Sequence, residues 1–358
     1  MMSPDGQQEL PVERSNRGAF TSALAKRSEG SEHPVRAFKF GGSSLLGAER
    51  MLHAARIVRE AASCANVVVV VSAMKRVTDR LLGIARTLEA GCRTDARRDA
   101  EHVFQLHMEV LRDLGLESQE HDRVARALQL LGQDLLHDAS PETQPCSAGR
   151  APLQDRLASY GERFSARLFA SALEKTGVPA VPVSSSEFVL TCDTFRDARP
   201  QIDETRRRGR EILLPLFDDG LVPVVTGFIG STRDGRVTTL GRNSSDFSGA
   251  LIANVVDADE LVIWTDVDGI YTANPHKCTE AELLHELSYD EAHALAAAGA
   301  KVLHAKVLPL AAATEMVIWV RNTFKPQLRG TRIGPVVHAN SSLNEAGACH
   351  NSIPRGEA

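Results

Sequence analysis

A lysine followed by two glycines and a serine is the first group of residues in the chain that could do chemistry. The group consists of Lys39, Gly41, Gly42 and Ser43. It lies where an apolar strand predicted over residues 35–40 gives way to a helix predicted over residues 45–61. Glycines let the backbone approach an anion closely, and N–H groups at such a turn, the helix dipole and the lysine charge together favour a phosphate. The lysine precedes the glycines, unlike in a P-loop, and a glycine pair at such a turn also serves packing alone.

Two further stretches carry charged and hydroxyl side chains at the ends of predicted elements. The first comprises Gly241, Arg242, Asn243, Ser244, Ser245 and Asp246, and the second comprises Trp264, Thr265, Asp266, Val267, Asp268, Gly269, Ile270 and Tyr271. The first stretch opens a helix predicted over residues 247–256, so Arg242 lies in the loop at its positive end. The planar guanidinium of an arginine there is suited to binding a carboxylate with two hydrogen bonds.

Together the three stretches resemble the aspartate kinases of the amino acid kinase family, and the resemblance runs from about residue 36 to residue 334. Asn243 and Trp264 resemble most the kinase domain of the bifunctional aspartokinase–homoserine dehydrogenases. The resemblance implies the family's carbamate kinase-like fold, a three-layer α/β/α sandwich around a mostly parallel sheet. It implies ATP-dependent phosphorylation of the side-chain carboxylate of L-aspartate to 4-phospho-L-aspartate. Mg²⁺ is expected with the nucleotide, bound by phosphates and water rather than by a protein metal site.

The resemblance also implies a role for each catalytic side chain. Lys39 would span the transferring phosphoryl group, Arg242 would clamp the substrate α-carboxylate, and Asp246 would orient Lys39 or the metal-bound phosphates. An acceptor carboxylate is already ionised at neutral pH, so the reaction needs cations and backbone donors rather than a general base. The nucleotide side is expected to comprise Lys39, Gly41, Gly42, Ser43, Thr265, Asp266, Tyr271 and Lys301.

The expected amino-acid side comprises Ser72, Thr78, Glu162, Phe195, Arg242 and Ser245. Ser72 ends a valine-rich strand predicted over residues 67–72, and the carboxyl ends of parallel strands are where open α/β sheets bind ligands. From the residues alone, Ser72 and Thr78 could instead cap the next helix. Glu162, in a segment at residues 159–166 that is predicted to open a helix, could merely complement the helix dipole, and Phe195 could be plain core packing. The resemblance instead assigns Glu162 to the substrate ammonium and Phe195 to the side of the bound amino acid.

One departure from the family pattern concerns the nucleotide. Asn274, Pro275 and His276 stand where Asp-Pro-Arg is usual, and the arginine would contact the ATP phosphates. Histidine is shorter and mostly neutral at pH 7. Either Lys277 or Lys306 compensates, or nucleotide affinity is reduced.

Two alternative functions therefore stay open beside the leading one. The first is a kinase for another small acid. The second is a degenerate kinase that serves as an amino-acid-binding or regulatory subunit.

The elements that must position these residues alternate between apolar strands and amphipathic helices, which indicates an α/β fold. Helical periodicity covers residues 79–138. The remaining predicted elements are strands at residues 178–183 and 188–191, a helix at 202–216, a buried strand and glycine-rich turn at 221–230, a hairpin tip at 233–236, a strand at 260–265, a helix at 294–303 and strands at 316–322 and 331–333.

The chain divides into three parts by composition. Residues 1–34 are polar and are expected to be a disordered arm. Residues 35–334 form the expected kinase domain, with an amino-acid lobe to about residue 215 and a nucleotide lobe from about residue 216. Residues 335–358 read as an irregular tail without the regulatory ACT domains of aspartate kinases, so inhibition by lysine or threonine is not expected. Any homodimer would form through the kinase domain.

Composition narrows the partners. The chain has 358 residues, 43% of them hydrophobic, and a net charge of -5, which gives no basic footprint for nucleic acid. No apolar run has the length of a transmembrane helix, so no membrane partner is expected. Six scattered cysteines without a CxxC pair fit a reducing cytoplasm. The expected partners are the small molecules L-aspartate and ATP.

Overall fold

The computed structural model describes residues 34–140, 150–242, 244–273, 278–297, 303 and 306–335. Within them, the centre of the fold is an eight-stranded sheet in the order β10-β12-β11-β7-β1-β2-β4-β3. Neighbouring strands run parallel, except for the antiparallel pair of β11 and β12. The strands are β1 (Val35–Phe40), β2 (Asn66–Val71), β3 (Ala180–Val183), β4 (Val222–Thr226), β7 (Glu260–Thr265), β10 (Glu286–Ser288), β11 (Val317–Asn322) and β12 (Thr331–Gly334).

Strand β1 lies in the middle of this sheet, hydrogen-bonded to β2 on one side and β7 on the other. Its side chains alternate between two cores: Phe38 and Phe40 pack into one and Ala37 into the other. The valines of β2 divide in the same way, and all five are buried. A strand covered on both faces by helices requires such a continuous apolar run.

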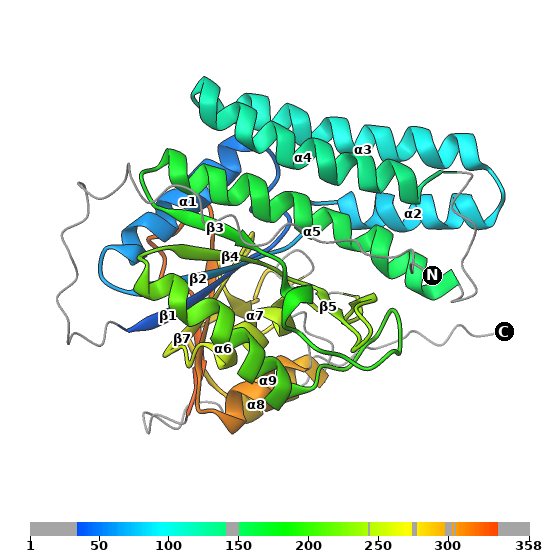
Figure 1. Ribbon diagram of the computed structural model, residues 1–358. Helices are drawn as coiled ribbons and strands as arrows, with labels where there is room; N and C mark the ends of the chain where they lie inside the picture. The colour runs from blue at the N-terminus through cyan, green and yellow to red at the C-terminus, as the bar shows by residue number, and fades with distance from the viewer. Residues whose placement is uncertain are drawn as a thin grey trace, which may run out of the picture.

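Helices cover both faces of the sheet (Figure 1). On one face lie α1 (Ala48–Ala62), α2 (Val77–Glu89), α3 (Arg93–Leu114), α4 (Ser118–Asp138) and α5 (Arg150–Lys175); on the other lie α6 (Ile202–Asp218), α7 (Ser245–Val255), α8 (Tyr289–Ala297) and α9 (Val307–Ala313). Helices α3 and α4 form an outer pair that packs on α2 and α5 (Figure 1). No helix in the described part of the chain is long and apolar enough to cross a membrane.

Two short antiparallel ribbons stand apart from the main sheet. One joins β5 (Ile229–Ser231) to β6 (Val237–Thr239), and the other joins β8 (Ile270–Tyr271) to β9 (Leu283–Leu284). The first ribbon contains the predicted hairpin tip at residues 233–236. It leads directly to Arg242.

The predicted α/β class with a mostly parallel sheet is confirmed, whereas several boundaries were wrong. Helix α1 begins at Ala48 rather than at residue 45, because a turn ending in Gly47, with a positive φ of 84°, precedes it. Helix α5 begins at Arg150, so residues 159–166 lie inside the helix and do not open it. Residues 188–191 form no strand; Leu190 and Thr191 make only isolated bridges to Ser231 and Pro200.

The remaining predictions concern the long helical stretch, the division into lobes and the last helix. The helical stretch at residues 79–138 is three helices, separated near Gly91 and Gly115, which both have positive φ. One sheet runs through both expected lobes, so the division into lobes stays a prediction. The helix predicted at residues 294–303 begins earlier, in α8, and its residues 298–302, among them Lys301, fall outside the described residues.

Candidate active site

An ion pair between Lys39 and Asp246 lies at the carboxyl edge of the sheet. Lys39 is the penultimate residue of β1, and its Nζ lies 2.7 Å from Asp246 Oδ1. Asp246 is in the first turn of α7, where a negative charge is favoured by the helix dipole. Gly249 lets α7 approach, because a Cβ there would lie 3.1 Å from the Cβ of Lys39. The lysine stem is therefore held by packing while its ammonium, in a side chain only 10% exposed, faces the carboxylate.

The two glycines after β1 differ in what they contact. A Cβ on Gly42 would lie 2.5 Å from the carbonyl oxygen of Ala73, so the turn packs directly on the end of β2. A Cβ on Gly41 would meet nothing closer than 3.7 Å. The Gly41 N–H donates to Trp264 O at 3.2 Å, so it is already occupied, whereas those of Gly42 and Ser43 donate to no described residue. Close packing, as much as anion binding, thus accounts for Gly42.

The helix dipole expected at this turn comes from a different helix. Helix α1 begins at Ala48, several residues beyond the glycines. The helix whose N-terminus adjoins Lys39 is α7, which begins at Ser245, just before the predicted range of residues 247–256.

Glu162 is a buried carboxylate in the middle of α5, only 2% exposed. Gly161 beside it packs on Ala73, since a Cβ at Gly161 would lie 2.6 Å from the Ala73 Cβ. Burial raises the pKa of Glu162 to about 8, while backbone hydrogen bonds, chiefly from Ala73, and the charge of Lys39 act in the opposite direction. Its Oε2 has no hydrogen-bond partner among the described residues. An unpartnered, desolvated carboxyl oxygen is costly and suits a cationic ligand group. Its place within the helix removes the dipole explanation.

Backbone hydrogen bonds gather the strand ends around Glu162 and Lys39. The Ser72 N–H donates to Phe40 O at 3.2 Å, and the Gly227 N–H donates to Val71 O at 2.9 Å. A Cβ on Gly227 would lie 3.6 Å from the Cβ of Ser245. Ser72 and Ser245 therefore flank the meeting point of β1, β2, β4 and α7.

Arg242 lies at the rim of this region and is largely exposed, with 73% of its side chain accessible. Its Nη1 is 3.8 Å from Asp79 Oδ1, in the first turn of α2 and next to Thr78. Because both charges are in water, this pair contributes little to stability. The guanidinium is thus placed beside the expected substrate residue Thr78 without being committed to a buried acid.

Phe195 belongs to a loop that several charged side chains hold in place. The Arg236 guanidinium lies 5.1 Å from its ring centroid, and the next residue, Arg196, has a left-handed φ of 71°. Asp197 accepts a hydrogen bond from Lys306 Nζ at 2.9 Å. Lys306, one of the two lysines that could replace the arginine absent at position 276, is therefore bound to the amino-acid side in this structure.

The nucleotide side is described in part. Thr265 ends β7, which is paired with β1, so Thr265 and the exposed Asp266 lie next to the glycine turn. Tyr271 lies in β8 and is partly buried. Asn243, residues 274–277 and Lys301 lie outside the described residues.

Sequence reasoning missed a loop after β11 that supports this side. Asp268 accepts hydrogen bonds from Asn322 and from Lys325, the latter at 2.9 Å, and both lower the pKa of its carboxyl. The hydroxyls of Ser44 and Thr323 lie 2.7 Å apart and are buried. These contacts join segments far apart in the sequence, and no local pattern marks them.

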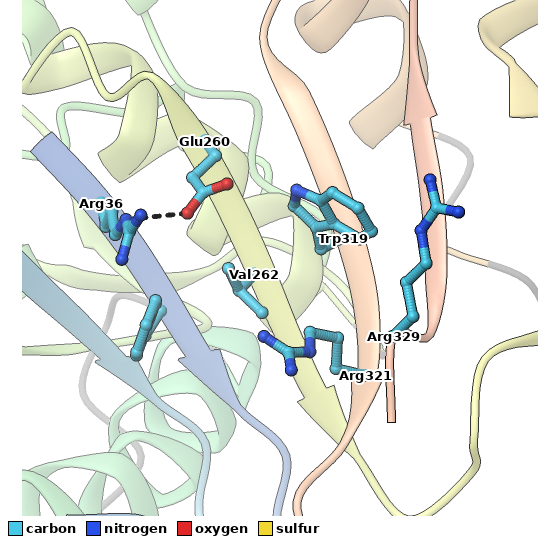
Figure 2. Close-up of a pocket in the computed structure, with 7 residues that line it drawn as sticks. Arg36, Glu260, Val262, Trp319, Arg321 and Arg329 are labelled. Atoms are coloured by element: carbon cyan, nitrogen blue, oxygen red, sulfur yellow. Dashed lines mark ion pairs between the residues drawn. The ribbon is translucent and has the colours of Figure 1, made fainter. Parts of the chain in front are cut away.

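A cavity of about 300 Å³ lies on the sheet face over β1, β7 and β11. Figure 2 shows the side chains that line it. Its lining residues are Arg36, Phe38, Glu260, Val262, Trp319, Arg321 and Arg329. Arg36 and Glu260 form an ion pair of 2.9 Å at the amino ends of their strands. None of the predicted site residues lines this cavity, so it is separate from the candidate active site.

The carboxylates at the site suit a Mg²⁺ ion that arrives bound to the nucleotide phosphates. Among the described residues, no group of three or more His, Cys, Asp or Glu side chains could hold a metal ion. Mg²⁺ dehydrates reluctantly and commonly keeps water and phosphate ligands, with one or two carboxylates nearby. Asp246 and Asp266 are such carboxylates at this edge.

Comparison with known proteins gives consistent matches. A model of the amino acid kinase family matches residues 35–322. The chain is 34% identical to lysine-sensitive aspartokinase 3 of Escherichia coli (strain K12) over 82% of this chain and 63% of that protein. It is 33% identical to the chloroplastic bifunctional aspartokinase/homoserine dehydrogenase 1 of Zea mays, over 82% of this chain and 32% of that protein.

Solved structures agree in fold. The crystal structure of E. coli aspartokinase III in complex with aspartate and ADP matches with a TM-score of 0.73 and 32% identity, covering 85% of this chain and 65% of that one. The chain thus spans less than two thirds of the length of these relatives. The resemblance predicted from the three stretches is confirmed, with both monofunctional and bifunctional proteins among the matches.

Proposed function

Because the chain belongs to the amino acid kinase family, we propose that it transfers the γ-phosphoryl group of ATP to the side-chain carboxylate of L-aspartate. The products would be ADP and 4-phospho-L-aspartate. The observation that carries the proposal is the buried Glu162, whose Oε2 has no partner among the described residues and which lies within electrostatic reach of Lys39. Such a carboxylate is suited to a substrate ammonium, which distinguishes an amino acid from a simple acid.

The chemistry requires two anions to meet in line. A carboxylate oxygen of aspartate forms the new O–P bond as the bond between the γ-phosphorus and the bridging oxygen of ADP breaks. Lys39 would offset the charge on the transferring phosphoryl group. Asp246 would hold the Lys39 ammonium in place through the 2.7 Å ion pair between the two side chains. Because the acceptor is already ionised, positioning and charge stabilisation supply the catalysis.

The amino-acid clamp would use charges at two ends. Glu162 would accept the ammonium, and Arg242 would bind the α-carboxylate at the rim, where it is exposed and only weakly paired. Ser72, just beyond β2, and Ser245, the first residue of α7, would contact the substrate between them.

On the nucleotide side, the N–H groups of Gly42 and Ser43, which donate to no described residue, would donate to phosphate oxygens. Thr265, Asp266, Tyr271 and Lys301 would contact the nucleotide. Mg²⁺, when bound with ATP, would offset phosphate charge, and Asp246 and Asp266 would orient its water ligands.

The test is ADP release measured over a panel of acidic amino acids, with hydroxylamine trapping of any acyl phosphate. Aspartate-dependent ADP release with a trapped hydroxamate supports the proposal, and Lys39→Met is the matched inactive control. ADP release that depends on a different acid would replace aspartate as the acceptor. Aspartate binding without ADP release would indicate a binding subunit instead.

A further inference from the structure

We propose that Asp155 is a positioning residue that fixes the two substrate-binding segments of the amino-acid site relative to Glu162. The inference rests on the proposed function, because it concerns how that same site is assembled. Asp155 lies in α5, is 1% exposed, and was not singled out by any sequence motif.

The carboxylate of Asp155 accepts hydrogen bonds from two segments that are distant in sequence. Oδ2 accepts from the Arg196 N–H at 2.9 Å and from the Thr239 N–H at 2.8 Å. Oδ1 accepts from the Thr239 hydroxyl at 2.9 Å. The first segment carries Phe195 and the second leads directly to Arg242, so one side chain holds both.

The two segments also contact each other at this point. The Ala198 N–H donates to Thr239 O at 2.9 Å. A Cβ on Gly241, which has a positive φ of 96°, would lie 2.8 Å from Asp197 Oδ1. Asp155 is therefore the buried anchor of a compact unit that presents the Phe195 ring and the Arg242 guanidinium.

Helix α5 connects this anchor to the expected ammonium site. Asp155 and Glu162 are two helical turns apart on the same face, a separation of about 10.5 Å along the axis at 1.5 Å per residue. A helix is stiff over that length. Glu162 would bind the substrate ammonium, and Arg242 would bind the substrate carboxylate. The distance between Glu162 and the segment that leads to Arg242 is thus set by one helix and three hydrogen bonds.

The hydrogen bonds require an acceptor rather than a charge. Backbone N–H groups can only donate, so Oδ2 must be unprotonated, whereas the Thr239 hydroxyl can donate or accept. Asparagine could keep this arrangement: its oxygen would accept both N–H groups, and its NH₂ would donate to the Thr239 hydroxyl. Alanine would remove all three hydrogen bonds.

Asp138 offers a matched control for the loss of a buried carboxylate against the same helix. It is 2% exposed, and its partners Arg156, at 2.9 Å, and Tyr160, at 2.8 Å, both lie on α5. Neither partner belongs to the segments that carry Phe195 or Arg242. Asp138→Ala should therefore weaken the fold without moving the substrate segments.

The experiment compares Asp155→Ala, Asp155→Asn and Asp138→Ala in the full chain, by steady-state kinetics and by amide hydrogen exchange. Asp155→Ala should raise the KM for aspartate at least about tenfold, with the KM for ATP within about twofold, because the three hydrogen bonds that hold the Phe195 and Arg242 segments are lost at the amino-acid side only. Asp155→Asn should stay within about threefold of the wild type, and Asp138→Ala within about twofold. The amides of Arg196 and Thr239 should exchange faster in Asp155→Ala than in Asp138→Ala.

Equal changes in both KM values, or equal exchange in the two alanine variants, would overturn the positioning role. If Asp155→Ala does not fold, Thr239→Val, which removes only the hydroxyl, should still raise the KM for aspartate more than the KM for ATP; no such difference would also overturn it. A wild-type protein without aspartate-dependent ADP release refutes the proposed function instead, and hydrogen exchange still decides whether Asp155 holds the two segments.

Discussion

Lys39 Nζ lies 2.7 Å from Asp246 Oδ1, although Lys39 is the penultimate residue of the central strand β1 and Asp246 comes much later in the sequence, in the first turn of α7. The pair is partly shielded from water and Gly249 packs on the lysine stem. A lysine held in this way keeps a fixed ammonium position before any ligand arrives. Preorganised charge is what phosphoryl transfer needs, because little energy is then spent on reorganisation during the reaction.

Lys39→Met should abolish turnover while the protein stays folded. The methionine keeps the stem that packs on Gly249 but removes the ammonium, so kcat should fall by about three orders of magnitude or more. ADP release and urea unfolding should be measured on the same preparation. Wild-type turnover in a folded Lys39→Met protein would rule out the catalytic role, and Lys39→Met/Asp246→Asn checks that an unpaired aspartate is not the cause of any unfolding.

Arg242→Gln should weaken aspartate binding selectively. The guanidinium is exposed and only weakly paired with Asp79, so its removal should cost little stability. The KM for aspartate should rise about tenfold or more, and the KM for ATP should change little. Asp79→Asn, which removes only the present partner, is the control. Similar increases in both KM values would mean that Arg242 has a general structural role.

The pH dependence of aspartate use should follow the ionisation of Glu162. Its pKa is raised to about 8 by burial, so below that pH the free protein holds it mostly neutral and without a charge for the ammonium. The value of kcat/KM for aspartate should therefore rise between about pH 6 and pH 8 and level off above, as expected for an essential base of the free enzyme. Glu162→Gln should have a low kcat/KM without this rise. A flat wild-type profile over that range would contradict the assignment.

Stability should show the opposite trend with pH. A carboxyl whose folded pKa is raised from 4.5 to about 8 stabilises the fold fully below pH 4.5, and that contribution is lost as the pH rises through 8. Ionising Glu162 should cost on the order of a few kcal/mol. The glutamine of Glu162→Gln cannot ionise. The unfolding free energy of this variant should therefore rise relative to that of the wild type between about pH 5 and about pH 8.5. Urea midpoints at both pH values provide the measurement, and a constant difference would show that burial does not control this group.

The two glycines of the turn should respond differently to alanine. At Gly42 the new Cβ would lie 2.5 Å from a backbone carbonyl oxygen, so Gly42→Ala should lower the free energy of unfolding by about 1–3 kcal/mol. At Gly41 the nearest atoms are 3.7 Å away, so Gly41→Ala should leave stability near that of the wild type. A rise in the KM for ATP in Gly41→Ala would then show that the nucleotide lies close to the backbone of Gly41. Equal stability of the two variants would show that the turn does not pack on Ala73 as described.

The sequence predicted features that depend on local patterns. The valine run of β2, the strand that contains Lys39 and the helix predicted over residues 247–256 all follow from apolar periodicity and from the residues beside it. The placement of Lys39 beside Asp246 followed from the family resemblance. The structure adds the ion pair between them.

Features that depend on distant contacts could not be predicted in this way. Gly42 is restricted by its close contact with Ala73. Burial among the elements packed around α5 raises the pKa of Glu162. Asp155 meets its donors across many residues, and its only sequence signal is its spacing of two helical turns from Glu162. The early start of α5 was missed because the helix was expected to open only at residues 159–166, whereas it begins at Arg150.

The central place of β1 has a consequence for how the chain reaches its fold during synthesis. One edge of β1 can pair with β2 as soon as residues 66–71 leave the ribosome, but its other edge waits for Glu260–Thr265. Until then an apolar strand edge stays open while residues 72–259 are synthesised, and such edges invite pairing with other chains. Pairings this distant in sequence also close slowly. Nascent chains of this protein should therefore depend on chaperones that shield strand edges, and a slowdown in translation before β7 should increase aggregation.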